Sequence, residues 1–278
     1  MKAFIMTDLE GVSGVNGRSD GIGNKIINTE AACRLLTEEV NAAVAGLVDG
    51  GAEEVLVVDG HGGSNSIHIE GLHPKASLKT AGGGLGPVTW VDASYDVALH
   101  IGTHAMIGVP EAFLNHTFNS HAVANMWLND TPVGEIAMEA LLTAYFGVPT
   151  GLVSGDRAAC VEAERFLGKV ETVETKVAQS RYAAVNRNPL RVREDIREAS
   201  RKAALDRATY PVKIEPPPYV LKIQLMCPNQ ADSYEMRGMK RLDHQTVLLE
   251  SDDLVDLWAQ RNGWAPGVHN ARFGIPRR

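Results

Sequence analysis

The sequence feature that most constrains the fold is an alternation of short apolar runs with helical patterns through the first half of the chain. The apolar runs have the length of buried strands and cover residues 3–7, 54–59, 97–102 and 149–154. Helical segments with capping signals lie between them, for example from Thr29 onward. Strands that alternate with helices build a parallel sheet covered by helices. We therefore predict an α/β fold with a mostly parallel central sheet flanked by helices.

The pattern changes near residue 180, where the apolar strand and helix units give way to a charged helix and a small mixed segment. The charged helix is predicted to begin at Asn188, and strands are predicted at residues 219–226 and 246–249. We predict two domains, an α/β domain at residues 1–180 and a smaller α+β domain at residues 181–278.

Composition excludes several classes of partner. The net charge of −7 argues against nucleic acid or an anionic membrane surface as the main partner. The 3 cysteines are far apart and odd in number, so a disulfide framework is not expected. The apolar stretch at the N-terminus is too short for a signal peptide, and no run approaches the length of a membrane span. We expect a cytoplasmic protein with no membrane partner and no nucleic-acid partner.

Side chains that can bind a metal follow three of the predicted strands. Asp8 and Glu10 come directly after the first strand, His61 after the second and His104 after the third. Ligands of an open parallel sheet bind outside the carboxyl ends of its strands. We therefore expect these side chains at one edge of the sheet. Asp8 and Glu10 should project the same way, because alternate residues of an extended chain share a face.

A fifth candidate, Glu135, lies where a helix is predicted to open, with Thr131 as cap and Pro132 in the first turn. A helix start should lie at the same edge as the preceding strand's end. Two imidazoles with three carboxylates, or four if Asp59 takes part, suit zinc, and manganese or cobalt would also be accepted. Such a set exceeds the needs of one tetrahedral zinc and suffices for two metals that share Asp8.

Each of these residues also has an ordinary structural interpretation when taken alone. A strand-end aspartate often caps a turn, and a glutamate in a first helical turn is favoured by the helix dipole. We favour the metal site because all five candidate ligands are expected at the same edge of the sheet. His116, in a loop after His104, could move protons near a metal-bound water, or it could be an ordinary loop histidine. The glycines at residues 82–84 are interpreted as a loop without phosphate-binding function.

Six short motifs resemble, in order and with similar spacing, those of the M55 metallopeptidases, the D-aminopeptidase family. The block from Asn129 to Glu135 is similar to the family's N-D-R-P-V-G-E and is the most specific match. The other five matches are Thr7-Asp8-Leu9-Glu10-Gly11 to S-x-D-x-E-G, Asp59-Gly60-His61-Gly62 to D-S-H-S, Gly102-Thr103-His104-Ala105 to G-Y-H-A, Asn115-His116-Thr117 to S-H-S, and Ser154-Gly155-Asp156 to A-G-D.

The resemblance implies a site with two zinc ions per subunit. Asp8 would bridge both ions, Glu10 and His104 would bind one, and His61 and Glu135 would bind the other. The residue at the position of the family's proposed catalytic residue is His116. The implied activity is removal of the N-terminal residue of short peptides through a metal-bound hydroxide, with D-amino acids preferred.

The resemblance also implies an assembly of stacked pentameric rings, a homodecamer that admits only short peptides. Residues 1–180 would then be the metal-binding catalytic domain, and residues 181–278 would serve oligomerisation and pocket closure. The sequence departs from the family motifs at Gly60 and Gly62, where the family has serines. The predicted ligands are unaffected by these changes, and substrate choice is the property they put in doubt.

Two other functions use similar residues. A binuclear phosphoesterase has the same ligand types, but it would bring an Asp-x-His element with Gly-Asp-x-x-Asp or Gly-Asn-His, and neither arrangement occurs here. A non-catalytic α/β binding protein would use the acids as helix caps. Metal content separates these interpretations, because a binding protein of that kind would hold none.

Overall fold

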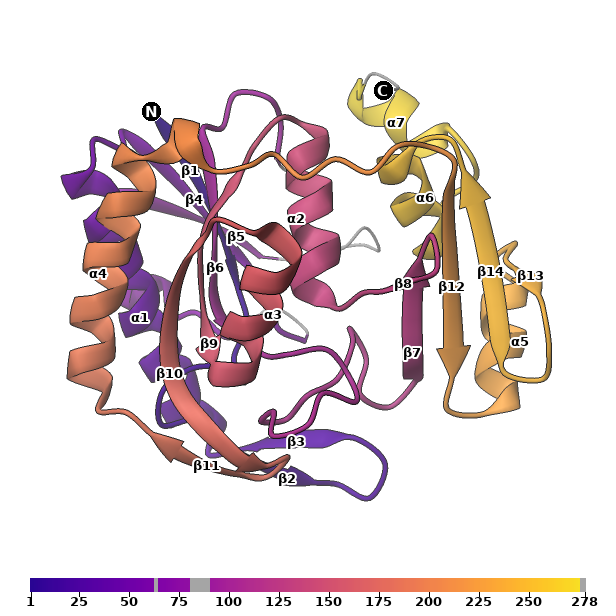
Figure 1. Ribbon diagram of the computed structural model, residues 1–278, viewed down its shortest axis with the longest axis horizontal. Helices are drawn as coiled ribbons and strands as arrows, with labels where there is room; N and C mark the ends of the chain where they lie inside the picture. The colour runs from indigo at the N-terminus through magenta and orange to yellow at the C-terminus, as the bar shows by residue number, and fades with distance from the viewer. Residues whose placement is uncertain (63–64, 81–90, 276–278) are drawn as a thin grey trace.

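The computed structural model describes residues 1–62, 65–80 and 91–275, and its largest element is a seven-stranded sheet (Figure 1). The strand order is β11-β10-β9-β6-β1-β4-β5, and every neighbouring pair is parallel except β10 with β11. This is the predicted α/β class. The strands are β1 (Lys2–Thr7), β4 (Glu54–Asp59), β5 (Ala76–Thr80), β6 (Val97–Thr103), β9 (Thr150–Asp156), β10 (Glu171–Ser180) and β11 (Ala183–Asn186).

Helices cover both faces of this sheet because its central strands are apolar on both sides. In β1, Ala3 and Ile5 pack into the core shared with α1 (Thr29–Asp49) and α4 (Pro189–Leu205). The alternate residues Phe4 and Met6 pack into the core shared with α2 (Glu135–Tyr145). The remaining helix on that side, α3 (Arg157–Leu167), packs on β9 and β10. Full burial of a side chain such as Phe4, Ile5 or Met6 contributes about 1.5–3 kcal/mol.

A second, antiparallel sheet lies on the far side of α2, so that this helix is between the two sheets (Figure 1). Its strand order is β13-β14-β12-β7-β8. Along β12 the burial alternates with period two, and the buried residues join the core around α2 and α6. The elements are β7 (Val123–Leu128), β8 (Thr131–Pro132), β12 (Tyr219–Leu225), β13 (Lys240–Arg241), β14 (Thr246–Ser251) and α6 (Leu254–Arg261).

Short elements complete the described chain. The hairpin of β2 and β3 lies below the main sheet in Figure 1. These elements are β2 (Asn16–Ser19), β3 (Asn24–Ile27), η1 (Ile69–Gly71), η3 (Arg207–Thr209), α5 (Pro228–Glu235) and α7 (Val268–Phe273).

The predicted start of α2 is wrong by one turn. Thr131 and Pro132 pair with β7 as β8, and the helix begins at Glu135 after Gly134, which provides no side-chain cap. A threonine followed by proline is also compatible with the end of an edge strand, since proline lacks the donor that a continuing ladder would need. Glu135 nevertheless begins the helix, as expected.

The predicted domain boundary near residue 180 stays a prediction. On its C-terminal side, α4 packs against α1 of the main sheet, and on its N-terminal side β7 pairs with β12. Within residues 1–62, 65–80 and 91–275, no helix has the length and apolar character needed to cross a membrane. The glycine run at residues 82–84 lies outside the described residues.

Candidate metal centre

The five predicted ligand residues meet at the carboxyl edge of the main sheet. Asp8 and Glu10 follow β1, and His104 follows β6, the parallel neighbour of β1. Nε2 of His104 lies 3.2 Å from Oδ2 of Asp8 and 3.2 Å from Oε1 of Glu135. Nε2 of His61 lies 3.6 Å from Oε1 of Glu10. The strand ends and the start of α2 thus deliver two imidazoles and three carboxylates to one place.

The ring of His104 is held so that Nε2 faces the carboxylates. Its Nδ1 lies 2.9 Å from the carbonyl oxygen of Ala105. A carbonyl oxygen only accepts, so Nδ1 carries a hydrogen, and the neutral form of the ring presents its lone pair at Nε2. Nε2 is buried and makes no hydrogen bond to any described residue. A metal-binding histidine is commonly oriented by such a bond from its other nitrogen.

Asp59 supports the centre through the loop that follows β4. Its Oδ2 accepts hydrogen bonds from the N–H groups of Ser66 and Ile67, at 2.6 and 3.2 Å. The hydroxyl of Ser66 lies in turn 3.1 Å from Nδ1 of His61. Asp59 therefore fixes the far end of the loop after β4 and, through Ser66, the orientation of the His61 ring.

Two buried charged residues that the sequence analysis did not single out hold the loop that follows β1. Nζ of Lys176, on β10, donates to the carbonyl oxygens of Glu10 and Val15 at 2.8 and 3.0 Å. Oε1 of Glu39, on α1, accepts from the N–H of Ser13 at 2.9 Å. The one signal in the sequence is an inward-facing lysine in an apolar strand, and it does not indicate which loop that lysine contacts.

The titration of the acids and imidazoles reflects their crowding. Burial, reinforced by the neighbouring Glu10 carboxylate, raises the pKa of Asp8 to about 7. Burial opposes charging of His61, but the Glu10 carboxylate outweighs it and raises the pKa of His61 to about 9. Although burial raises the pKa of Glu10, the facing His61 holds it well below its ordinary value. Buried carboxylates in this proximity need nearby positive charge, which protons or metal ions supply.

His116 lies against the centre and stacks on His104, with ring centroids 4.0 Å apart and planes 17° apart. Its Nδ1 lies 2.9 Å from the carbonyl oxygen of Leu114, which places the hydrogen on Nδ1. Nε2 then carries the lone pair and lies 3.9 Å from Oε1 of Glu135. Burial, together with the neighbouring His104, lowers the pKa of His116, so its neutral, proton-accepting form is favoured.

The backbone around His116 is strained. Glu111, Leu114 and Phe118 have φ angles of 51°, 50° and 57°, in the left-handed region that residues with a Cβ rarely adopt. Each such residue costs about 1–3 kcal/mol and persists only when its surroundings enforce it. The N–H of Phe118 donates to Oε1 of Glu135 at 2.7 Å, which is one such contact.

The donor set fits divalent metal ions. Oε2 of Glu10 and Nε2 of His104 are buried and make no hydrogen bond among the described residues, a costly state without a further partner. Ligand atoms of Asp8, Glu10 and His104 all lie within 4.8 Å of one another, as do those of His104, His116 and Glu135. Mixed imidazole and carboxylate ligands at the carboxyl edge of a parallel sheet define the class of a metal-dependent hydrolase.

Comparison with known proteins identifies the family within this class. The family model of the M55 peptidases, described as D-aminopeptidase, matches residues 1–261, and the chain belongs to that family. The chain is 31% identical over 263 residues to the D-aminopeptidase of Bacillus subtilis, covering 93% of this chain and 94% of the relative.

A solved structure has the same fold. It is the Zn-dependent D-aminopeptidase DppA from Bacillus subtilis, described as a self-compartmentalizing protease, with a TM-score of 0.85 and 29% identity over 94% of this chain and 95% of that one. The matches confirm the predicted family, the α/β fold class and the enzyme class, a metallo-aminopeptidase. They argue against the phosphoesterase and the non-catalytic binding protein.

Proposed function

We propose that this protein is a zinc-dependent aminopeptidase that removes the N-terminal residue of short peptides, with a preference for D-amino acids. The single observation that carries the proposal is the position of His104 Nε2, 3.2 Å from carboxylate oxygens of both Asp8 and Glu135 and without a hydrogen bond. Support for the substrate class comes from the D-aminopeptidase names of the family and of the Bacillus subtilis relative.

Two zinc ions per subunit are proposed to share Asp8. Glu10 and His104 would bind one ion, since their ligand atoms form one close group with Asp8. His61 and Glu135 would bind the other ion, as the family resemblance implies. When bound, the zinc ions would activate water and polarise the scissile carbonyl.

The catalytic role proposed for this chain's own side chains falls to His116. Its Nδ1 is committed to the carbonyl oxygen of Leu114, so Nε2 accepts a proton from the reacting water and returns it to the departing amine. The stacked ring of His104 and the contact of Phe118 with Glu135 keep His116 beside the ligands.

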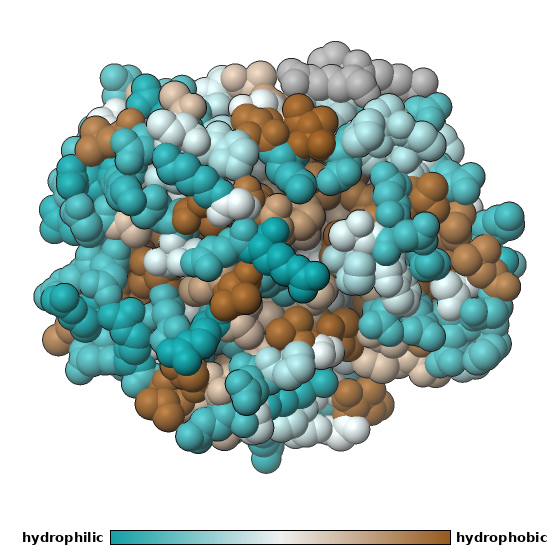
Figure 2. Space-filling model, viewed as in Figure 1, coloured by the Kyte–Doolittle hydropathy of each residue, from teal (hydrophilic) through white to brown (hydrophobic). Residues whose placement is uncertain are grey.

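Assembly and location are proposed from the relative. DppA is described as self-compartmentalizing, and we propose that this chain also forms a closed ring-shaped homo-oligomer of stacked pentamers in the cytoplasm. On the face in Figure 2, hydrophobic residues form separate patches among hydrophilic ones. Exposed apolar side chains such as Met236, 88% exposed, and Ile214, 67% exposed, would be covered in such an assembly. Light scattering of the purified protein tests this, and a monomer would refute it.

The experiment for the metal centre is zinc analysis of the wild type beside Asp8→Ala, with the exposed Asp252→Ala as the matched control. The proposal expects about two zinc ions per chain in the wild type and in the control, and a loss in Asp8→Ala. Parallel assays with D- and L-aminoacyl peptides test the substrate class. A folded wild type that takes up no zinc, or that cleaves neither series, would refute the proposed function.

A further inference from the structure

We propose that Arg261 binds the terminal carboxylate of the peptide substrate and so selects short peptides with a free C-terminus. This inference rests on the proposed function and adds a substrate-binding residue to it. Arg261 is the last residue of α6, which belongs to the layer of the second sheet. Its guanidinium carbon lies 4.7 Å from the ring centroid of Phe118 and 4.4 Å from that of Trp258.

Arg261 is one side chain away from the metal centre. Arg261 contacts the ring of Phe118. The backbone N–H of the same residue donates to Oε1 of Glu135 at 2.7 Å. Phe118 also follows His116 by two positions in the chain. Burial lowers the pKa of the Arg261 guanidinium, and the Glu135 carboxylate opposes that shift. A positive charge is thus fixed beside the place where a peptide would be cleaved.

The guanidinium has unused hydrogen-bond donors. Within the part of the chain that the structure describes, Arg261 forms no ion pair, and its Nε is shielded from solvent without a hydrogen bond. The one hydrogen bond from its terminal nitrogens, to Oδ1 of Asn262, is long at 3.4 Å. By contrast, Arg187 and Arg241 pair with carboxylates. A desolvated guanidinium without an anion is costly, and its planar fork matches a carboxylate.

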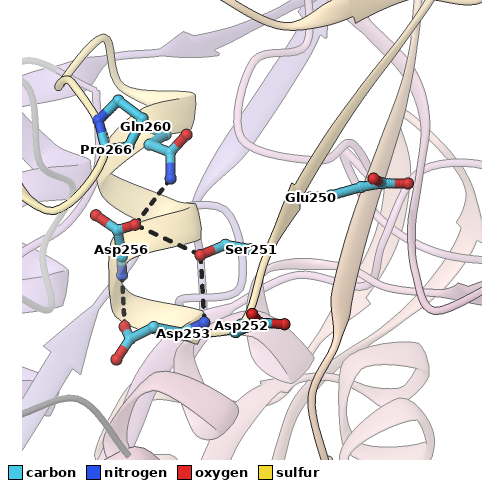
Figure 3. Close-up of a pocket in the computed structure, with 7 residues that line it drawn as sticks. All are labelled: Glu250, Ser251, Asp252, Asp253, Asp256, Gln260 and Pro266. Atoms are coloured by element: carbon cyan, nitrogen blue, oxygen red, sulfur yellow. Dashed lines mark hydrogen bonds between the residues drawn. The ribbon is translucent and has the colours of Figure 1, made fainter.

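The hydrogen-bond network at the other end of α6 explains why Arg261 is fixed in place. Oδ1 of Asp253 accepts from the N–H of Asp256, and Oδ2 of Asp256 accepts from Gln260, both at 2.8 Å (Figure 3). The hydroxyl of Tyr145, the last residue of α2, donates to Oδ2 of Asp253 at 2.6 Å. Asp253 therefore caps α6 and, through Tyr145, anchors it to α2, the helix that begins with Glu135.

The chemistry of a short peptide matches this arrangement. An aminopeptidase binds the amino end of its substrate at the metal centre, and in a dipeptide or tripeptide the carboxylate follows within about 3.5 Å of chain per residue. Long peptides and C-terminal amides do not offer a carboxylate there.

The test compares one dipeptide, D-alanyl-D-alanine, with its C-terminal amide as substrates of the zinc-loaded wild type, Arg261→Gln, Arg261→Lys and a control. The control is Arg272→Gln, which removes an arginine that also stacks on two rings, those of Trp264 and Phe273, but in α7. The wild type and the control should prefer the free acid. Arg261→Gln should lower that preference about 10- to 100-fold, the effect of one lost charged hydrogen bond, mainly through KM, and Arg261→Lys should restore part of it.

The outcomes separate the inference from the proposed function. If Arg261→Gln lost the same factor in kcat/KM on the free dipeptide and on its amide, the arginine would only support the rings of Phe118 and Trp258. That result would overturn the inference. A wild type that cleaves acid and amide equally well would also overturn it, with the aminopeptidase proposal intact. A wild type that cleaves neither peptide, nor their L-forms, would refute the proposed function itself.

Discussion

Nζ of Lys176 donates a hydrogen bond to the carbonyl oxygen of Glu10 at 2.8 Å and ties the loop after β1 to strand β10. The lysine is fully buried. A second bond to the carbonyl oxygen of Val15, at 3.0 Å, and the ring of Phe113, 4.4 Å from Nζ, complete its surroundings. A buried ammonium that faces carbonyl oxygens fixes the backbone of a proposed metal ligand while leaving the carboxylate of Glu10 available.

The first prediction concerns Lys176→Met, which keeps the length of the side chain and removes its donors. Two buried carbonyl groups would lose their partner, at about 1–3 kcal/mol each, so the free energy of unfolding should fall by about 2–6 kcal/mol. The loop would also lose its anchor, and zinc content should fall. Chemical denaturation and metal analysis measure both effects. Lys202→Met, on the exposed face of α4, is the control, and wild-type zinc content in Lys176→Met would show that Lys176 does not position Glu10.

The second prediction concerns pH and Glu39. Burial raises the pKa of the Glu39 carboxyl from an ordinary value of 4.5 to about 7, although the N–H of Ser13 and the charge of Lys176 oppose the shift. Between these values the folded protein binds more protons than the unfolded chain. The stabilisation present below pH 4.5 is therefore lost as the pH rises through about 7.

Glu39→Gln removes this titration and keeps an acceptor for Ser13. The wild type should lose roughly 3 kcal/mol relative to Glu39→Gln between about pH 4.5 and pH 7, since one pKa unit corresponds to about 1.4 kcal/mol. Denaturant titrations of both proteins across this pH range measure the difference in their free energies of unfolding. The contributions of the other titrating groups are the same in both proteins and cancel in that difference. The exposed Glu38→Gln is the neighbouring control. A difference that does not change with pH would contradict the raised pKa.

Much of the fold could be predicted because it depends on local patterns. The strands at residues 54–59 and 97–102 follow from short apolar runs, and the structure has both. The N-cap of α6 is Asp253, although Ser251, two residues earlier, is also a capping residue type. Either residue satisfies the capping rule, and only the tertiary contact of Asp253 with Tyr145 distinguishes them.

The elements that were not predicted depend on pairing between distant segments. Strand β7 alternates only weakly and was not recognised, yet it joins β12 in the second sheet. The position of Glu135 was predicted from a strand end in the main sheet, but the strand before it belongs to the second sheet. Glu135 reaches the centre because α2 packs between the two sheets. Lys176 and Arg261 could not be predicted, since Glu10 and Phe118, which they contact, lie more than a hundred residues away along the chain.

The third prediction concerns Gly11, which follows the ligand Glu10. The N–H of Gly11 donates to the carbonyl oxygen of Gly102 at 2.8 Å, and a Cβ at this position would overlap the carbonyl oxygen of Thr103. Gly11→Ala must therefore push the ligand loop away from the end of β6. The free energy of unfolding should fall by about 3 kcal/mol, and zinc content should fall with it.

Gly71→Ala is the matched control, because its added Cβ would meet the nearest atom, Cγ2 of Thr37, at an ordinary 3.7 Å. Its stability and zinc content should stay near wild type. If Gly11→Ala also kept full zinc content, the close approach of the loop to β6 would not be required for the metal centre.

The last prediction separates proton transfer from metal binding at His116. His116→Ala removes Nε2 beside Glu135 and the ring stacked on His104, but none of the five proposed ligands. If His116 transfers protons, kcat should fall by about 10²–10⁴-fold, while zinc content stays near wild type because Asp8 and Glu135 still face His104. Steady-state kinetics with a D-aminoacyl dipeptide, beside metal analysis, measure both quantities. His244→Ala, in an exposed turn, should change neither. Turnover within a few-fold of wild type would remove His116 from the mechanism, and a parallel loss of zinc would make it a ligand instead.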